Sequence, residues 1–328
     1  MKMERISVVV PAYNNAPDLK RSLDSLLAQT YANLEIIVVN DGSTDDTRQV
    51  LDAYTWQHPS VRVIHKENGG VTSARLRGVA EASGAWIGFM DGDDVVEPQM
   101  YARLMENANA YDADISHCGH QVHFPDGRIT FVHKTEKIRT QDRKRGLQDL
   151  LENEVEGSLC LKLYRRELFE GLADWMDTSV RNNEDLLMNY YLFSRANQSV
   201  FEGICPYHYL LRKGSASYSG ITEHAIFDPI RVRQFLLKDC DQDMKADVRR
   251  ALLRNLLFAY AQLTVAPDWR QLGAFRQRVR SQLRAERQYF CLLSVRNRIL
   301  TEMICRAPWS FHVAYRMFVA LFQREEQH

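Results

Sequence analysis

The sequence predicts an α/β protein built on a doubly wound, mainly parallel sheet, followed by a C-terminal helical extension. In the first hundred residues, short apolar β-branched runs alternate with amphipathic segments of helical period, which is typical of βαβ units. From about residue 221 onward the chain shows only amphipathic helical patterns, including a leucine-rich stripe over residues 252–263. We therefore expect an α/β domain over residues 1–220 and a helical region over residues 221–328.

Four apolar runs in the first part of the chain predict buried strands, and they cover residues 6–10, 35–40, 61–65 and 85–90. Helices are predicted between them, beginning near Pro17, after the loop 41–46, and over residues 71–83. Parallel strands present their carboxyl ends at one edge of a sheet, where ligands bind. The loops that follow the four strands should therefore meet at one edge.

The pattern is less regular after Pro98. A helix is expected over residues 99–110, and Pro125-Asp126-Gly127 predicts a hairpin between two alternating segments, 117–124 and 128–133. The remaining expectations are a helix over residues 141–153, a polar loop region bracketed by residues 158–164 and 183–194, and an aromatic strand over residues 200–211.

Composition excludes several classes of protein. The 328 residues carry 42 basic and 42 acidic side chains, so no overall positive field favours nucleic acid as a partner. Six scattered cysteines without a CxxC pair indicate reduced thiols in a cytoplasmic protein. The apolar run at residues 6–10 is too short for a signal peptide. Charged residues and Pro308 interrupt residues 303–322, so we expect no transmembrane helix.

Asp91-Gly92-Asp93-Asp94 follows the fourth predicted strand directly. Three carboxylates beside an apolar core cannot all ionise without a large desolvation cost. A divalent cation would relieve that conflict, because Mg²⁺ and Mn²⁺ favour carboxylate oxygens together with substrate phosphates. The alternative is an acidic turn before the helix that starts near Pro98. The cluster therefore suggests a metal-dependent enzyme that acts on a phosphorylated ligand.

Four motifs occur in order at the strand ends: residues 7–14 (SVVVPAYN), 39–45 (VNDGSTD), 68–75 (NGGVTSAR) and 89–94 (FMDGDD). Three weaker ones follow, at residues 161–164 (LKLY), at 183–185 (NED) and at 207–209 (YHY) with Arg212. Together they resemble the family 2 glycosyltransferases of the GT-A fold, strongly over residues 6–96 and moderately as far as residue 217.

This resemblance implies an inverting glycosyltransferase that moves a sugar from a UDP-sugar to a hydroxyl of a glycan or lipid-linked acceptor. It also implies a Mn²⁺ or Mg²⁺ cofactor and a role in cell-surface polysaccharide synthesis. The nucleotide-binding half would span residues 1–97 and the acceptor half residues 98–220.

The resemblance also assigns roles to donor-side residues. Asp41 would accept a hydrogen bond from the uracil N3–H, although a helix-capping role is the alternative, and Tyr13 would pack on the base. Asp91 would contact the ribose or the metal, and Asp93 would bind the metal. Asp94 would orient the loop. The full implied donor-binding set is Pro11, Tyr13, Asn14, Asp41, Asn68, Gly69, Arg75, Asp91, Gly92, Asp93, Arg212 and Ser217.

On the acceptor side, the resemblance makes Asp185 the catalytic base and places Glu184 beside it. The alternative is an acidic helix N-terminus, and both descriptions can hold together. His208 is a candidate third metal ligand, with a packed core histidine as the alternative. Trp175 and Lys162 are candidate acceptor contacts, and core or structural roles are equally open for them.

Three other functions are alternatives to glycosyl transfer. A sugar-nucleotide nucleotidyltransferase would need a glycine-rich basic loop after the first strand, and an NAD-dependent dehydrogenase would need GxGxxG there. Neither pattern is present. A non-catalytic sugar-nucleotide-binding protein is the third alternative. The aromatic and arginine-rich residues 299–322 favour either a peripheral membrane-surface helix, at the inner face of the cell membrane, or a core or homodimer helix.

Overall fold

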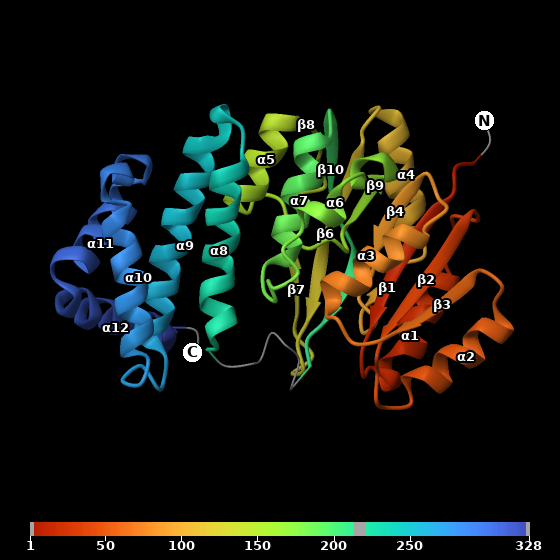
Figure 1. Ribbon diagram of the computed structural model, residues 1–328, viewed down its shortest axis with the longest axis horizontal. Coiled ribbons are helices and arrows are strands. Elements are labelled where there is room, and N and C mark those ends of the chain that lie inside the picture. The colour runs from red at the N-terminus through yellow and green to blue at the C-terminus, as the bar shows by residue number, and fades with distance from the viewer. Residues whose placement is uncertain (1–2, 213–220, 326–328) are drawn as a thin grey trace. The chain divides into compact units, whose positions relative to one another are not determined.

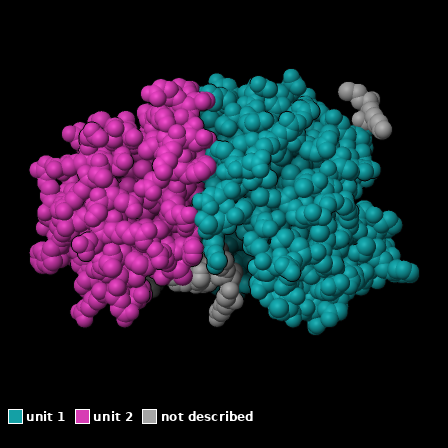
Figure 2. Space-filling model, in the orientation of Figure 1, with its two compact units in different colours: residues 1–219 teal, residues 220–328 magenta. Residues whose placement is uncertain are grey.

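The computed structural model describes residues 3–212 and 221–325 (Figure 1). The chain divides into two compact units, Met1–Ser219 and Gly220–His328, which Figure 2 shows in different colours. Each unit has its own buried core and is described by itself.

The first unit is built on one sheet, whose strands among residues 3–212 run in the order β3-β2-β1-β4-β9-β6-β10-β5. Its first half consists of four parallel strands: β1 (Ile6–Ala12), β2 (Leu34–Asp41), β3 (Val61–Lys66) and β4 (Trp86–Phe89). The central strand β1 is buried along almost all of its length, as a β-branched run predicts for a strand covered on both faces. The predicted parallel half-sheet is confirmed.

The second half of the sheet is mixed. Its strands are β5 (Val95–Val96), β6 (Ile115–His123), β7 (Ile129–Val132), β8 (Ile138–Asp142), β9 (Lys162–Arg165) and β10 (Gln198–Leu210). Strand β9 lies antiparallel between β4 and β6, whereas β10 runs parallel to β6. The predicted hairpin is confirmed as β6–β7, but β5 and β8 were not predicted.

Helices α1 to α7 complete this unit. They are α1 (Ala16–Leu27), α2 (Thr47–Gln57), α3 (Val71–Glu81), α4 (Met100–Ala110), α5 (Arg143–Glu152), α6 (Leu172–Trp175) and α7 (Glu184–Arg195), with a 3₁₀ turn η1 (Arg166–Phe169). Helix α3 packs closely on β1, since a Cβ at Gly78 would lie 2.3 Å from a methyl carbon of Val9. This close approach fixes α3, and therefore Arg75, against the sheet.

The second unit is helical. Its helices are α8 (Glu223–Asp239), α9 (Lys245–Val265), α10 (Gly273–Ala285), α11 (Val295–Arg306) and α12 (Pro308–Glu325), with 3₁₀ turns η3 (Gln242–Met244) and η4 (Arg287–Leu292). The leucine stripe of α9 is buried, so its members belong to the core of this unit. Among the described residues, no helix combines the length and the apolar character needed to cross a membrane.

Candidate active site

The predicted site residues gather around one buried arginine. Arg75 lies on α3 and is 3% exposed. Its guanidinium donates to Asp91 Oδ1 at 3.1 Å, to Glu184 Oε1 at 3.3 Å and also to Asp185 Oδ1. Burial opposes its charge, but the nearby carboxylates raise the pKa of Arg75 above its ordinary value. Arg75 therefore joins the acidic motif after β4 to the acidic motif at the start of α7.

Glu184 and Asp185 occupy the first turn of α7, where the helix dipole favours acidic groups. Burial, followed by the negative charge of Asp185, raises the pKa of Glu184 to about 8. Burial also raises the pKa of Asp185, whereas the charge of Arg75 opposes that rise. The pair therefore holds a proton near neutral pH, and a carboxylate with a pKa near the working pH is well suited to proton transfer.

The three aspartates after β4 have different surroundings. Asp93 accepts a hydrogen bond from Arg212, which also binds Asp18. Burial and the charge of Asp91 raise the pKa of Asp93 to about 6. This shift marks an excess of negative charge at the carboxyl end of β4.

Asp94 is 1% exposed and faces strand β10. Its Oδ2 accepts from the Tyr207 hydroxyl at 2.6 Å and its Oδ1 from the Leu210 backbone N–H at 3.0 Å. Burial, followed by the charge of Asp91, raises the pKa of Asp94 to about 8. Its contacts are those of a carboxyl that positions β10.

The nucleotide-side loops are organised by Asp41, at the end of β2. Its Oδ1 accepts from the Gly69 N–H at 3.0 Å and its Oδ2 from the Gly70 N–H at 2.7 Å, while Lys66 Nζ binds Oδ1. Asn68 Nδ2 donates to the Asp41 backbone oxygen at 2.9 Å. Asp41 therefore shapes the loop 68–70, and Lys66 is a partner that sequence reasoning missed.

The loop after β1 is tied to the loop after β2. Asn14, with φ +48°, accepts from the Thr44 N–H at 2.8 Å. Pro11 lies within β1, and the neighbouring Tyr13 ring is 53% exposed. At Gly92, a Cβ would lie 2.3 Å from Asn15 Nδ2 and 3.2 Å from the Pro11 backbone oxygen, so the turn after β4 packs closely against the loop after β1.

A cavity of ≈ 250 Å³ opens beside Arg75's partners. It is lined by Asp91, Asp94, His120, Glu156, Ser158, Leu161, Asp185, Tyr207 and Tyr209. Sequence reasoning missed His120 and Glu156. His120 lies opposite Tyr207 in the β6–β10 register, a pairing that no local pattern reveals. Its buried Nδ1 has no hydrogen-bond partner among the described residues, and burial lowers its pKa.

His208 does not join this cavity. Side chains alternate along a strand, so Tyr207 and Tyr209 face the cavity and His208 faces away. Its Nε2 lies 3.3 Å from Glu97 Oε1, and its ring stacks on His123 at 4.9 Å between centroids. The metal-ligand role of His208 stays a prediction, and in this structure its Nε2 lies near Gln121 and Glu97.

Lys162 and Trp175 serve other contacts. Lys162 is 1% exposed, and its Nζ donates to the backbone oxygens of Glu156 at 2.6 Å and Ser158 at 2.5 Å. Burial lowers its pKa to about 8. Lys162 therefore holds the segment that brings Glu156 to the cavity. Trp175 is half-buried on α6 and packs against Tyr191 of α7, with ring centroids 5.0 Å apart. The predicted Ser217 lies outside the described residues.

The described residues contain no cluster of three or more His, Cys, Asp or Glu side chains placed to bind a metal ion. Mg²⁺ and similar cations, however, commonly use one or two carboxylates and complete their coordination with water and substrate phosphates. Asp91 and Asp93 fit that arrangement, because they are neighbouring carboxylates and, after burial, the charge of Asp91 is what raises the pKa of Asp93.

Comparison with known proteins gives consistent results. The model of the family described as "Glycosyl transferase family 2" matches residues 7–172. The chain is 34% identical over 268 residues to the uncharacterized glycosyltransferase EpsJ of Bacillus subtilis (strain 168), covering 77% of each. It is 30% identical over 272 residues to glycosyltransferase GlyG of Streptococcus pneumoniae serotype 4, covering 79% of this chain and 88% of GlyG.

A solved structure shares the fold. The crystal structure of S. aureus TarS 1-349 in complex with UDP-GlcNAc superposes with a TM-score of 0.71 at 20% identity, covering 98% of this chain and 92% of that chain. The predicted GT-A-like architecture with C-terminal helices is thereby confirmed.

Proposed function

Because the chain belongs to glycosyl transferase family 2 and is therefore a glycosyltransferase, we propose that it transfers a sugar from a UDP-sugar to a hydroxyl group with inversion. The observation that carries this proposal is the placement of Arg75 between Asp91 and Asp185. It brings the donor-side carboxylate and the proposed base to one side chain. The complex of TarS with UDP-GlcNAc supports the choice of donor class. Family membership removes the nucleotidyltransferase, dehydrogenase and non-catalytic alternatives.

The donor's nucleotide would bind over the loops after β1 and β2. The exposed ring of Tyr13 offers a face on which a base can stack. The Asp41 carboxylate accepts from Gly69, Gly70 and Lys66, yet a carboxylate offers about four acceptor positions, so one remains for the uracil N3–H.

The donor's diphosphate would lie near the carboxyl end of β4. Asp91 and Asp93 are the residues that would hold a Mn²⁺ or Mg²⁺ ion. A divalent cation bound there stabilises the negative charge that develops on the departing diphosphate. Arg212, which binds Asp93 in this structure, carries a guanidinium suited to pairing with phosphate oxygens.

The chemical step would use the cavity beside Asp185. The acceptor hydroxyl oxygen attacks the anomeric carbon from the face opposite UDP, and its proton passes to the Asp185 carboxylate. The bond to UDP breaks with its electron pair, through an oxocarbenium-like transition state. The charge of Arg75 opposes the rise in the pKa of Asp185 that burial causes, and burial raises the pKa of Glu184 to about 8. His120 and Glu156 line the same cavity as Asp185 and are therefore candidate contacts for the acceptor.

The acceptor class is also a proposal: a hydroxyl of a glycan or of a lipid-linked sugar, in polysaccharide synthesis. The named relatives EpsJ and GlyG do not decide between these acceptors. A panel of UDP-sugars, incubated with the purified protein and bivalent cations, would identify the donor through release of UDP.

The matched test of the base compares Asp185→Asn with Asp174→Asn, which changes an exposed aspartate on α6. We expect Asp185→Asn to lower turnover by about 10²–10⁴-fold, the usual contribution of a general base, with UDP affinity in calorimetry almost unchanged. Asp174→Asn should behave as the wild type. Normal turnover by Asp185→Asn would overturn the assignment, and failure to release UDP from any UDP-sugar would overturn the donor class.

A further inference from the structure

Helix α12 turns its apolar side outward. Trp309 is 76% exposed, Met317 61% and Leu321 64%. All the exposed side chains described on this helix, over residues 308–321, are uncharged. An ordinary surface helix of a globular protein presents polar residues to water and apolar residues to the core.

Two polar side chains of α12, His312 and Arg316, are partly buried and contact other elements of the unit. Arg316 Nη1 donates to the Thr264 backbone oxygen at 3.1 Å, and the His312 ring packs on Trp269 with centroids 4.3 Å apart. The outward apolar side is therefore built into the packing of α12, because rotating the helix would break both contacts.

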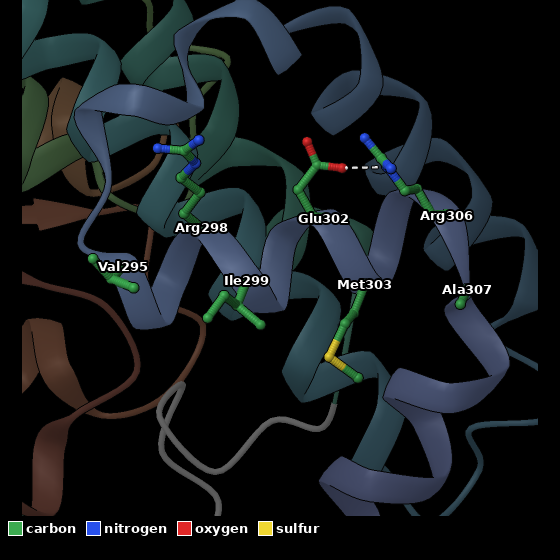
Figure 3. Close-up of a pocket in the computed structure, with 7 residues that line it drawn as sticks. All are labelled: Val295, Arg298, Ile299, Glu302, Met303, Arg306 and Ala307. Atoms are coloured by element: carbon green, nitrogen blue, oxygen red, sulfur yellow. Dashed lines mark hydrogen bonds and ion pairs between the residues drawn. The ribbon is translucent and has the colours of Figure 1, made fainter.

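Helix α11 adds a second apolar row beside a charged one. Val295, Ile299, Met303 and Ala307 recur every four residues, and Figure 3 shows them along one side of the helix. Arg298, Glu302 and Arg306 form a parallel row, in which Arg306 donates to Glu302 at 2.8 Å. The two rows line a cavity of ≈ 630 Å³. Apolar and cationic groups thus lie side by side on α11.

The surrounding sequence is strongly basic. Residues 273–328 contain ten arginines and four glutamates, with no lysine or aspartate, whereas the whole chain has a formal net charge of zero. Arg296 and Arg298 are exposed, and neither forms a hydrogen bond or ion pair with any described residue. Their charge is therefore available to an external partner of opposite sign.

We propose that α11 and α12 dock the protein on an anionic lipid surface. The docking residues are the exposed apolar side chains of these two consecutive helices, Val295 and Ile299 on α11 and Trp309, Met317, Phe318 and Leu321 on α12, together with the exposed Arg296 and Arg298. Tryptophan and aliphatic side chains insert at the boundary between headgroups and acyl chains, and arginines beside them attract anionic headgroups. The combination of exposed apolar rows with unpaired positive charge matches this partner.

A second copy of the chain is the competing occupant. A two-fold interface places the same surface against itself, so two patches that each carry an excess of arginine would be brought together. Like charges held together in this way oppose association. Charge complementarity therefore favours an anionic lipid surface over a second copy of the chain. This inference does not depend on which donor or acceptor the enzyme uses.

The test uses the full-length protein in flotation assays. We expect binding to vesicles of phosphatidylcholine mixed with phosphatidylglycerol, little binding to phosphatidylcholine alone, and weaker binding at high salt. Arg296→Gln and Arg298→Gln should each lower the partition coefficient about fivefold, the effect of one basic residue near an anionic surface. Failure of the intact protein to bind the mixed vesicles would overturn the proposal.

The apolar contribution is tested with the double variant Trp309→Ser, Leu321→Ser, whose changed side chains are exposed and should leave the fold intact. It should lose vesicle binding, whereas Trp56→Ser, which changes a 91% exposed tryptophan on α2, should retain it. Light scattering without lipid distinguishes the competing occupant. A wild-type dimer that becomes monomeric in the double variant would assign the face to self-association and refute lipid docking, as would vesicle binding by the double variant at the wild-type level.

Discussion

Replacing Asp94 with asparagine should make the protein's stability less sensitive to alkaline pH. Asp94 is almost fully buried and bonded to the Tyr207 hydroxyl and the Leu210 N–H. Asparagine has nearly the same shape and retains an oxygen that can accept from the backbone N–H. The change therefore removes a titratable group from the core while preserving the packing around it.

The magnitude follows from the raised pKa of Asp94, about 8 against an ordinary value of 3.8. Between these values the folded protein holds a proton that the unfolded chain releases, so stability falls as pH rises. The slope contributed by one such group is about 1.4 kcal/mol per pH unit, flattening near the folded-state pKa. From pH 6 to pH 8 the wild type should therefore lose about 2 kcal/mol through Asp94, a loss that Asp94→Asn avoids.

Urea unfolding at pH 6, 7 and 8 measures this difference. At pH 6 the folded forms of both proteins are neutral at position 94, but the unfolded wild-type chain is ionised there, so Asp94→Asn should already be the more stable protein. The stability of Asp94→Asn relative to the wild type should then grow with pH. Asp46→Asn, which changes an exposed aspartate, serves as the control and should show no such trend. A stability difference that stays constant from pH 6 to pH 8 would refute the reasoning.

Two further predictions concern the same cluster. Arg75→Met leaves three carboxylates without their shared partner and should destabilise the protein by about 3–5 kcal/mol at pH 8 in urea unfolding. The loss should shrink at pH 5, because burial raises the pKa of Glu184 and Asp185 and so favours their neutral forms at lower pH, and equal losses at both pH values would contradict this account. Asp93→Ala should abolish the increase in UDP affinity that Mn²⁺ produces in calorimetry, whereas His208→Ala should preserve it. If His208→Ala also lost the Mn²⁺-dependent increase in UDP affinity, His208 would be a metal ligand.

The parallel half of the fold was predictable because its signals are local. The run of residues 6–10 is β-branched and apolar throughout, and the structure buries it in the centre of the sheet as β1. Leucines at helical spacing likewise predicted the buried side of α1, which includes Leu19, Leu23 and Leu26. In each case the residues that specify the element lie within it.

The mixed half of the sheet was not predictable in the same way. Strand β9 has four residues and lies antiparallel between β4 and β6, and β5 has only two. Such short segments carry too few residues to show a period, and their pairing depends on partners distant in the sequence. The role of Lys162 was likewise not predictable from its motif, which left an acceptor contact and a structural role open. In the structure its amine binds the backbone oxygens of Glu156 and Ser158.

The central role of Arg75 also depends on distant contacts. The resemblance placed it in the donor-binding set, and the structure shows its guanidinium bound to Asp91, Glu184 and Asp185. Glu184 is 109 positions away in the sequence. No local pattern specifies that α3 and the start of α7 meet. The sequence therefore could not predict that three carboxylates bind Arg75.

Strand β10 shows most directly why a motif does not determine which side chain enters a site. Tyr207, His208 and Tyr209 were recognised together, and histidine is the chemically obvious ligand of the three. A strand alternates its side chains, however, and a shift of one residue in register would exchange the two faces. The pairing of Tyr207 with His120 sets the register, and the bond from Tyr207 to Asp94 holds it. The cavity is therefore lined by His120 of β6 and not by His208, and only the three-dimensional pairing of the strands determines which histidine lies there.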